Sequence, residues 1–198
     1  MEDHITIKPA LAEKFKTAMR QSRVIFFSAP CGFGKTTLAK TLLKNCRAKV
    51  YETTEDKMDF TAIRTDKKWN VLLADDLQLL CNREEQQELC EIIRNSPEKR
   101  FVFMTRGMIP GWLIPFQLSG LLYDVEAEEM FFDRKTAEKF FEGCGLKLSE
   151  TVFNAIMQDS MGYPLALTII AGRMEKGAEY DGKLSGEVIH EIYLYYDE

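Results

Sequence analysis

The sequence predicts an α/β fold, in which a parallel five-stranded sheet is sandwiched by helices and followed by a small helical lid. Two observations predict it. Short apolar runs alternate with helix-forming segments, and strands that alternate with helices favour a parallel sheet. After about residue 128 the pattern changes to helices alone. We therefore predict an α/β core at 1–128 and a helical lid subdomain at 129–198.

Five short apolar runs are the expected strands. Runs of this length without a polar alternation are typical of parallel strands that are buried on both faces. A helix at 9–19 is expected before the first run, since Leu11 and Phe15 follow helical spacing. The expected strands are 24–28, 50–54, 71–74, 101–104 and 121–125. Only 15 residues, 55–69, join the second strand to the third, which is enough for a short crossover helix.

Capping residues predict where later helices begin. Asn82 precedes a segment that carries Leu89 at helical spacing, and Asp133 and Ser149 precede two further apolar segments. Side chains of this kind accept hydrogen bonds from free N–H groups in a first helical turn. Pro164 is expected in the first turn of a last helix, where its missing N–H costs nothing.

The composition argues against several classes of protein. The chain has 198 residues, of which 45% are hydrophobic and 29% charged, as in ordinary globular domains. Its net charge of −5 gives no overall basic field for nucleic acid or an anionic membrane. Five cysteines without a CxxC pair and only two histidines form no zinc-ligand pattern. With no signal-peptide layout and no membrane-length apolar run, we expect a cytoplasmic protein with no membrane partner.

A phosphate-binding motif follows the first expected strand and opens a helix. Gly32 and Gly34 allow the backbone N–H groups to wrap around a phosphate, and Lys35 places a charge against the β- and γ-phosphates. The Thr36 hydroxyl is placed to bind Mg²⁺, and Thr37 can reach the α-phosphate. We therefore predict binding of a nucleoside triphosphate with magnesium. The residues expected to bind the nucleotide are Ala29, Pro30, Gly32, Phe33, Gly34, Lys35, Thr36 and Thr37.

Two aspartates end the third expected strand, in the pattern called Walker B. Asp75 is expected to hold the Mg²⁺ shell through water, next to the Thr36 ligand. Asp76 stands where a carboxylate can activate the attacking water, so we predict that it is catalytic. An Asp-Asp turn after a core strand, without a metal, is the structural alternative.

Charged residues also follow two other strands. Arg106 comes after the fourth strand, and the carboxyl ends of parallel strands open on one ligand side of a sheet. We predict that Arg106 senses the γ-phosphate as a second catalytic residue; a solvated loop arginine is the alternative. Glu52, Glu55 and Asp56 follow the second strand. One of them could orient the attacking water, although a solvated acidic loop explains them as well.

Several of these segments resemble one family. The run from Ser28 to Leu38 resembles the P-loop of MalT-like, ATP-dependent LuxR-type transcription regulators. These regulators belong to the STAND class of signalling NTPases, relatives of AAA+ ATPases. Leu73-Ala74-Asp75-Asp76-Leu77 is similar to their Walker B strand. Gly162-Tyr163-Pro164-Leu165 resembles their Gly-x-Pro lid motif, whose proline packs near the nucleotide. The resemblance covers most of residues 5–175.

The resemblance implies a slow ATPase that acts as a nucleotide switch with ATP or ADP and Mg²⁺, and it adds Pro164 to the nucleotide-binding residues. It also implies further C-terminal domains, an inducer or regulatory protein as a partner, and ATP-dependent self-association. DNA would bind only through a domain absent here, because we find no helix-turn-helix and no basic recognition helix. The connection at 55–69 is shorter than the helical insert that the family usually carries.

Two other functions remain open at this point. A DnaA- or DnaC-like AAA+ replication ATPase fits the run from Leu72 to Gln78, although no arginine finger is identifiable and the chain is acidic. A small-molecule P-loop kinase would need extra arginines for a second phosphate. The candidate arginines, which show no clear cluster in the sequence, are Arg83, Arg94, Arg100 and Arg134.

Overall fold

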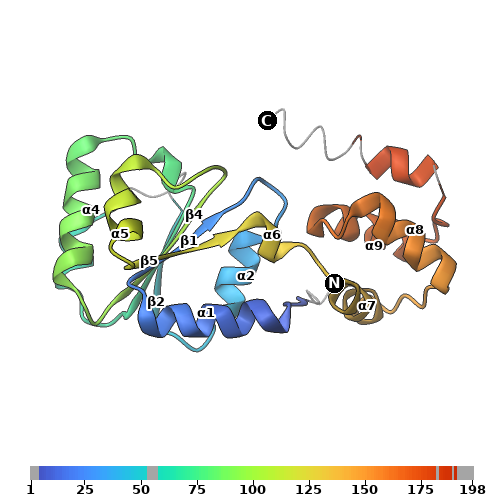
Figure 1. Ribbon diagram of the computed structural model, residues 1–198, viewed down its shortest axis with the longest axis horizontal. Helices are drawn as coiled ribbons and strands as arrows, with labels where there is room; N and C mark the ends of the chain where they lie inside the picture. The colour runs from blue at the N-terminus through green and yellow to red at the C-terminus, as the bar shows by residue number, and fades with distance from the viewer. Residues whose placement is uncertain (1–4, 53–57, 182, 189, 191–198) are drawn as a thin grey trace. The chain divides into compact units, whose positions relative to one another are not determined.

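The computed structural model describes residues 5–52, 58–181, 183–188 and 190 (Figure 1). Within this part of the chain, five strands form one parallel sheet in the order β2-β3-β4-β1-β5. This arrangement confirms the predicted α/β fold class. The strands are β1 (Val24–Ser28), β2 (Ala48–Glu52), β3 (Val71–Asp75), β4 (Arg100–Thr105) and β5 (Leu122–Glu126).

The central strands are apolar on both faces because helices cover each face. On one face, Phe26 and Phe103 join a buried cluster with side chains from α3 (Phe60–Thr65), α4 (Arg83–Asn95) and α5 (Ile114–Leu118). Burial of such large side chains is the main favourable term in folding. Figure 1 shows α4 and α5 together on this side of the strands.

Two other helices cover the opposite face. The ring centroid of Phe27 in β1 lies 6.1 Å from that of Phe15 in α1 (Pro9–Gln21). Neighbouring residues of a strand point to opposite faces, so Phe26 and Phe27 bury the two sides of the same strand. The second helix, α2 (Lys35–Leu42), contacts β4 and buries Ala39 completely.

The predicted caps start the helices where the sequence indicates. Asn82 accepts hydrogen bonds from the N–H groups of Glu84 and Glu85 in the first turn of α4. Asp133 caps α7 (Arg134–Gly143) and Ser149 caps α8 (Glu150–Ser160) in the same way. Pro164 is the first residue of α9 (Pro164–Glu175). The sequence did not predict the shorter elements, which are α5, α6 (Ala127–Met130) and the 3₁₀ helices η1 (Leu77–Leu79) and η2 (Gly111–Leu113).

The chain folds as two compact units. The sheet unit comprises Ala10–Pro30 and Lys35–Ala127. The helical unit comprises the described residues from 128 onward, together with 5–9 and the loop residues Cys31–Gly34. Its core packs side chains of α7, α8 and α9, among them Phe141, Ile156 and Leu167. The division into domains at residue 128 stays a prediction. No helix in the described part of the chain combines the length and the apolar character that crossing a membrane requires.

Candidate nucleotide-binding site

The loop between β1 and α2 requires its glycines. Gly32 has φ of 79° and Gly34 has φ of 71°, a left-handed conformation that residues with a side chain rarely adopt. The loop ends where α2 begins, at Lys35. The first N–H groups of a helix have no partner within it, so a helix that starts directly after such a loop favours an anion at its N-terminus.

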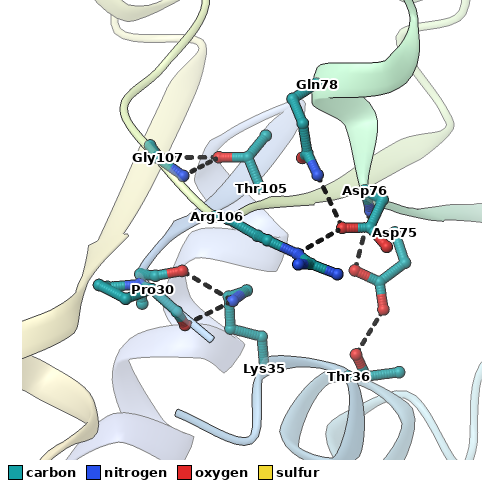
Figure 2. Close-up of polar contacts among 10 residues, drawn as sticks. Pro30, Lys35, Thr36, Asp75, Asp76, Gln78, Thr105, Arg106 and Gly107 are labelled. Carbon is teal, nitrogen blue, oxygen red and sulfur yellow. Dashed lines mark hydrogen bonds and ion pairs between the residues drawn. The ribbon is translucent and has the colours of Figure 1, made fainter. Parts of the chain in front are cut away.

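Lys35 is buried and held by the carbonyl groups of its own loop. Its side chain keeps only 8% exposure, and Nζ donates hydrogen bonds to the Ala29 oxygen at 2.7 Å and the Pro30 oxygen at 2.8 Å (Figure 2). A buried ammonium group is costly unless it is hydrogen-bonded. The loop backbone therefore both stabilises this charge and positions it at the start of α2.

The hydroxyl group of Thr36 contacts the last residue of β3. Thr36 Oγ1 donates a hydrogen bond to Asp75 Oδ2, and Asp75 Oδ1 accepts one from the Asp76 N–H at 2.9 Å. Thr36 and Asp75 are 39 residues apart in the chain, and both were predicted to serve magnesium. Hydroxyl and carboxylate oxygens are the hard donors that Mg²⁺ prefers, so these residues fit the ion. No group of three or more His, Cys, Asp or Glu side chains that could hold a metal occurs among the described residues.

In the described part of the chain, Asp76 has two side-chain partners, and both contact the same oxygen. Oδ1 accepts a hydrogen bond from Gln78 Nε2 at 2.7 Å and forms an ion pair with Arg106 Nε at 3.4 Å (Figure 2). The Asp76 side chain is 23% exposed, whereas that of Arg106 is 57% exposed. Asp76 also has φ of 50°, which is uncommon for a residue other than glycine, although aspartate tolerates it better than most.

Thr105 fixes the backbone on both sides of Arg106. The Thr105 side chain is buried, and its Oγ1 donates to the Gly107 oxygen at 2.7 Å and accepts from the Gly107 N–H at 3.3 Å. The strand that ends at Thr105 lies between β3 and β1 in the sheet. Arg106 therefore leaves the sheet at the edge where Asp75 also ends its strand.

The sheet unit thus brings together five predicted site residues from three separate segments. Lys35, Thr36, Asp75, Asp76 and Arg106 all lie at the carboxyl edge of β1, β3 and β4. Thr37 follows in the first turn of α2. The nucleotide, metal and catalytic roles assigned to these residues stay predictions.

The acidic residues after β2 divide into two groups. The carboxylate of Glu52 pairs with Lys40 at 2.9 Å, and both side chains are largely exposed. Such surface pairs contribute little to stability. Glu55 and Asp56 lie outside the described residues.

In the helical unit, Tyr163 contacts the tip of the loop. Its hydroxyl group donates a hydrogen bond to the Cys31 oxygen at 2.7 Å, and its ring centroid lies 5.0 Å from that of Phe33. A Cβ atom added to Gly32 would lie 2.3 Å from the Tyr163 hydroxyl oxygen, so this close approach also requires a glycine. Pro164, the predicted nucleotide contact, is the buried first residue of α9, and its role stays a prediction.

Sequence reasoning missed two of these contacts. It assigned no role to Gln78, although an amide two residues after Asp76 is close enough in the chain to have been considered. It also assigned none to Tyr163 itself. Tyr163 and Cys31 are 132 residues apart, and nothing local in the sequence indicates that they meet.

Comparisons with known proteins identify the fold. No protein-family model matches the sequence, and no curated protein matches it. Among solved structures, a Walker-type ATPase of Pyrococcus abyssi is similar with a TM-score of 0.71 and 11% identity, over 96% of this chain and 73% of that one. The RuvB Holliday junction branch migration motor of Thermotoga maritima has a TM-score of 0.62 and 16% identity, over 96% and 70%.

A third similar structure is a STAND protein, a signal transduction ATPase with a tetratricopeptide repeat sensor, from Pyrococcus horikoshii. Its TM-score is 0.63 at 13% identity, and the match covers 95% of this chain but only 33% of that one. Identities this low show the fold alone. Together with the strand order and the C-terminal helices, they show that the chain has the P-loop NTPase fold of AAA+ and STAND ATPases.

Proposed function

We propose that this chain binds ATP with magnesium and hydrolyses it slowly, as a nucleotide switch. The hydrogen bond between Thr36 and Asp75 carries the proposal. It joins Thr36, which follows Lys35 of the phosphate-binding motif, to Asp75, the first Walker B aspartate, and a shared magnesium shell requires these two groups to lie close together. A glycine-rich turn without a nucleotide-binding role would not require contact with a carboxylate from another strand.

Binding of the triphosphate is assigned to the loop and the start of α2. The N–H groups around Gly32 and Gly34 would contact phosphate oxygens, and the Lys35 ammonium would turn from two carbonyl groups towards the β- and γ-phosphates. Thr36 and, through water, Asp75 would hold magnesium. The ion would neutralise charge on the β- and γ-phosphate oxygens.

Hydrolysis is assigned to Asp76 and Arg106. A water oxygen attacks the γ-phosphorus, the bond to the β-phosphate oxygen breaks, and Asp76 accepts the proton from the water. Arg106 stabilises the negative charge on the γ-phosphate oxygens. Exposed ion pairs of this kind contribute about 0–1 kcal/mol, so exchanging Asp76 for a phosphate partner costs Arg106 little.

The biological role that we propose rests on the sequence resemblance. It is that of a signal-responsive transcription regulator of the LuxR/MalT type, in which DNA binds outside these 198 residues and an inducer or regulatory protein sets the nucleotide state. The STAND protein with a similar fold is longer than this chain, and the match covers only 33% of it. A regulator with further domains outside these 198 residues would have a similar layout. Slow hydrolysis suits a switch, because each nucleotide state must last long enough for a partner to respond to it.

Calorimetric titration of ATP·Mg²⁺ into the wild type and a Lys35→Ala variant tests the function. We expect binding by the wild type and an affinity about tenfold lower or worse in the variant, because charge-assisted hydrogen bonds to the phosphates are lost. Lys40→Ala is the control, since Lys40 is an exposed lysine of the same helix that pairs with Glu52. Equal affinity of the Lys35 variant and the wild type would overturn the assignment.

Phosphate release with and without DNA or small acceptors separates the alternatives. A switch domain of a LuxR-type regulator should hydrolyse ATP at a rate that DNA does not change, because we assign DNA binding to another domain. Stimulation by DNA would favour a replication ATPase. Transfer of the phosphate to a small acceptor would favour a kinase.

A further inference from the structure

We propose that Gln78 is a positioning residue, which keeps the Asp76 carboxylate oriented for catalysis when Arg106 moves to the γ-phosphate. The inference rests on the proposed ATPase function. It assigns a task to a residue that has none in the proposed function, and it explains why Asp76 has two partners of different kinds on a single oxygen.

The amide contact is the shorter of the two. Gln78 Nε2 lies 2.7 Å from Asp76 Oδ1, and Arg106 Nε lies 3.4 Å from the same atom. An ionised carboxylate only accepts hydrogen bonds, so Gln78 must present its NH₂ group to it. Figure 2 shows the Gln78 and Arg106 side chains converging on the same Asp76 oxygen.

The backbone that carries Gln78 is fixed, although its side chain is exposed. The residue before it, Leu77, is fully buried and belongs to the main core of the sheet unit. Leu80, at the end of η1, is also buried in that core. Asp76 begins this short helix in the left-handed conformation. The distance between the backbones of Asp76 and Gln78 therefore cannot change without moving buried leucines.

The two partners of Asp76 differ in their chemistry. Arg106 is a cation that a γ-phosphate attracts, so Asp76 would lose this contact when ATP binds. Gln78 is a neutral amide that a phosphate does not attract in this way, and it keeps Oδ1 in place. Oδ2 is the oxygen that accepts the proton from the attacking water.

A matched pair of glutamines separates this role from simple support of η1. Gln86 Nε2 donates a hydrogen bond to the Leu80 oxygen at 2.6 Å, so Gln86 supports the same short helix from α4 without contacting Asp76. A Gln78→Ala variant should lower kcat for ATP hydrolysis about tenfold, since a hydrogen bond to a charged group is lost. The dissociation constants for ATP and ADP should change less than twofold. Gln86→Ala should lower the melting temperature and leave kcat within twofold of the wild type.

A double-mutant cycle shows whether Gln78 acts through Asp76. In an Asp76→Asn background, Gln78→Ala should change the single-turnover rate less than twofold, because the group that it positions is no longer a base. An undiminished tenfold effect in that background, or equal kcat values for Gln78→Ala and the wild type, would overturn the inference and leave the ATPase assignment intact. A wild type that binds but does not hydrolyse ATP would overturn both the hydrolytic role and this inference.

Discussion

The two adjacent carboxylates at the end of β3 have different partners, and this difference supports the different tasks that we propose for them. Asp75 accepts from the Thr36 hydroxyl, on the side where the metal is proposed to bind. Asp76 contacts an amide and a guanidinium group instead. Side chains that are neighbours in sequence thus face separate chemical surroundings, because the chain turns sharply at Asp76.

The first residue-scale prediction follows from that difference. Asp75→Asn should weaken Mg²⁺-dependent ATP binding about tenfold, since one charge-assisted contact to the metal shell is lost. Asp76→Asn should leave the affinity within about twofold and lower kcat about 100-fold, as expected when a general base is removed. Titration calorimetry and single-turnover hydrolysis measure the two effects. An equal loss of affinity in both variants would make Asp76 a second metal-shell ligand.

The second residue-scale prediction concerns Arg106. Only ATP offers it a γ-phosphate, so Arg106→Ala should reduce ATP affinity about tenfold while ADP affinity stays almost unchanged. Arg64→Ala is the control, because Arg64 is a similarly exposed arginine that pairs with Glu88 on the surface. If both nucleotides lose affinity equally in the Arg106 variant, the residue is structural.

At the scale of elements, local signals predicted the long segments well. The first strand was predicted at 24–28 and is found there, since four consecutive apolar residues before Ser28 are typical of a buried parallel strand. Asn82, Asp133 and Ser149 cap the helices that they were expected to cap, because such a hydrogen bond closes within three residues. Helix α5 has only five residues, too few to show a helical period, and it was missed.

In the candidate site, too, residues with local signals could be predicted from the sequence and distant contacts could not. Asp75 and Arg106 could be placed at one edge from the sequence because parallel strands share their carboxyl ends. The partners that support them could not. The Gln78–Asp76 bond depends on the left-handed turn at Asp76, and that conformation has no clear signal at a residue other than glycine. The Tyr163–Cys31 bond depends on how distant parts of the helical unit pack.

An element-scale prediction concerns the start of α9, where Tyr163 precedes the first helical residue and contacts the loop. Tyr163→Phe should lower ATP affinity about fivefold, because the net contribution of one hydrogen bond is about 1 kcal/mol and the loop loses a restraint on its conformation. Tyr180→Phe is the matched control. Tyr180 donates its hydroxyl hydrogen bond to Asp159 in the same unit, not to the loop. Unchanged affinity in the Tyr163 variant would show that the loop keeps its conformation without this bond.

At the scale of the whole molecule, the predicted phosphate-binding loop belongs partly to each compact unit. Cys31–Gly34 group with the helical unit, whereas Ala29, Pro30 and Lys35 group with the sheet unit. The loop tip packs through Phe33 against Phe131 and Tyr163, at ring-centroid distances of 5.1 and 5.0 Å. If phosphate binding changes the conformation of the loop, we expect these contacts to transmit the change to the start of α9 within the helical unit.

The last prediction uses this route. A ligand shifts a conformational equilibrium only by its differential affinity for the two states, and ATP differs from ADP by the γ-phosphate that Arg106 is proposed to contact. We therefore expect backbone hydrogen exchange in 133–174 to differ between the ATP-bound and ADP-bound protein, with the largest difference at the start of α9. Tyr163→Phe should reduce that difference, because the Cys31 carbonyl then loses the bond that joins the loop tip to α9. Mass spectrometry of deuterated peptides measures both effects. The nucleotide is saturating, so a change in affinity does not alter the measured exchange. Identical exchange in the two complexes of the wild type would mean that the helical unit does not respond to the nucleotide, and that the chain binds ATP without acting as a switch.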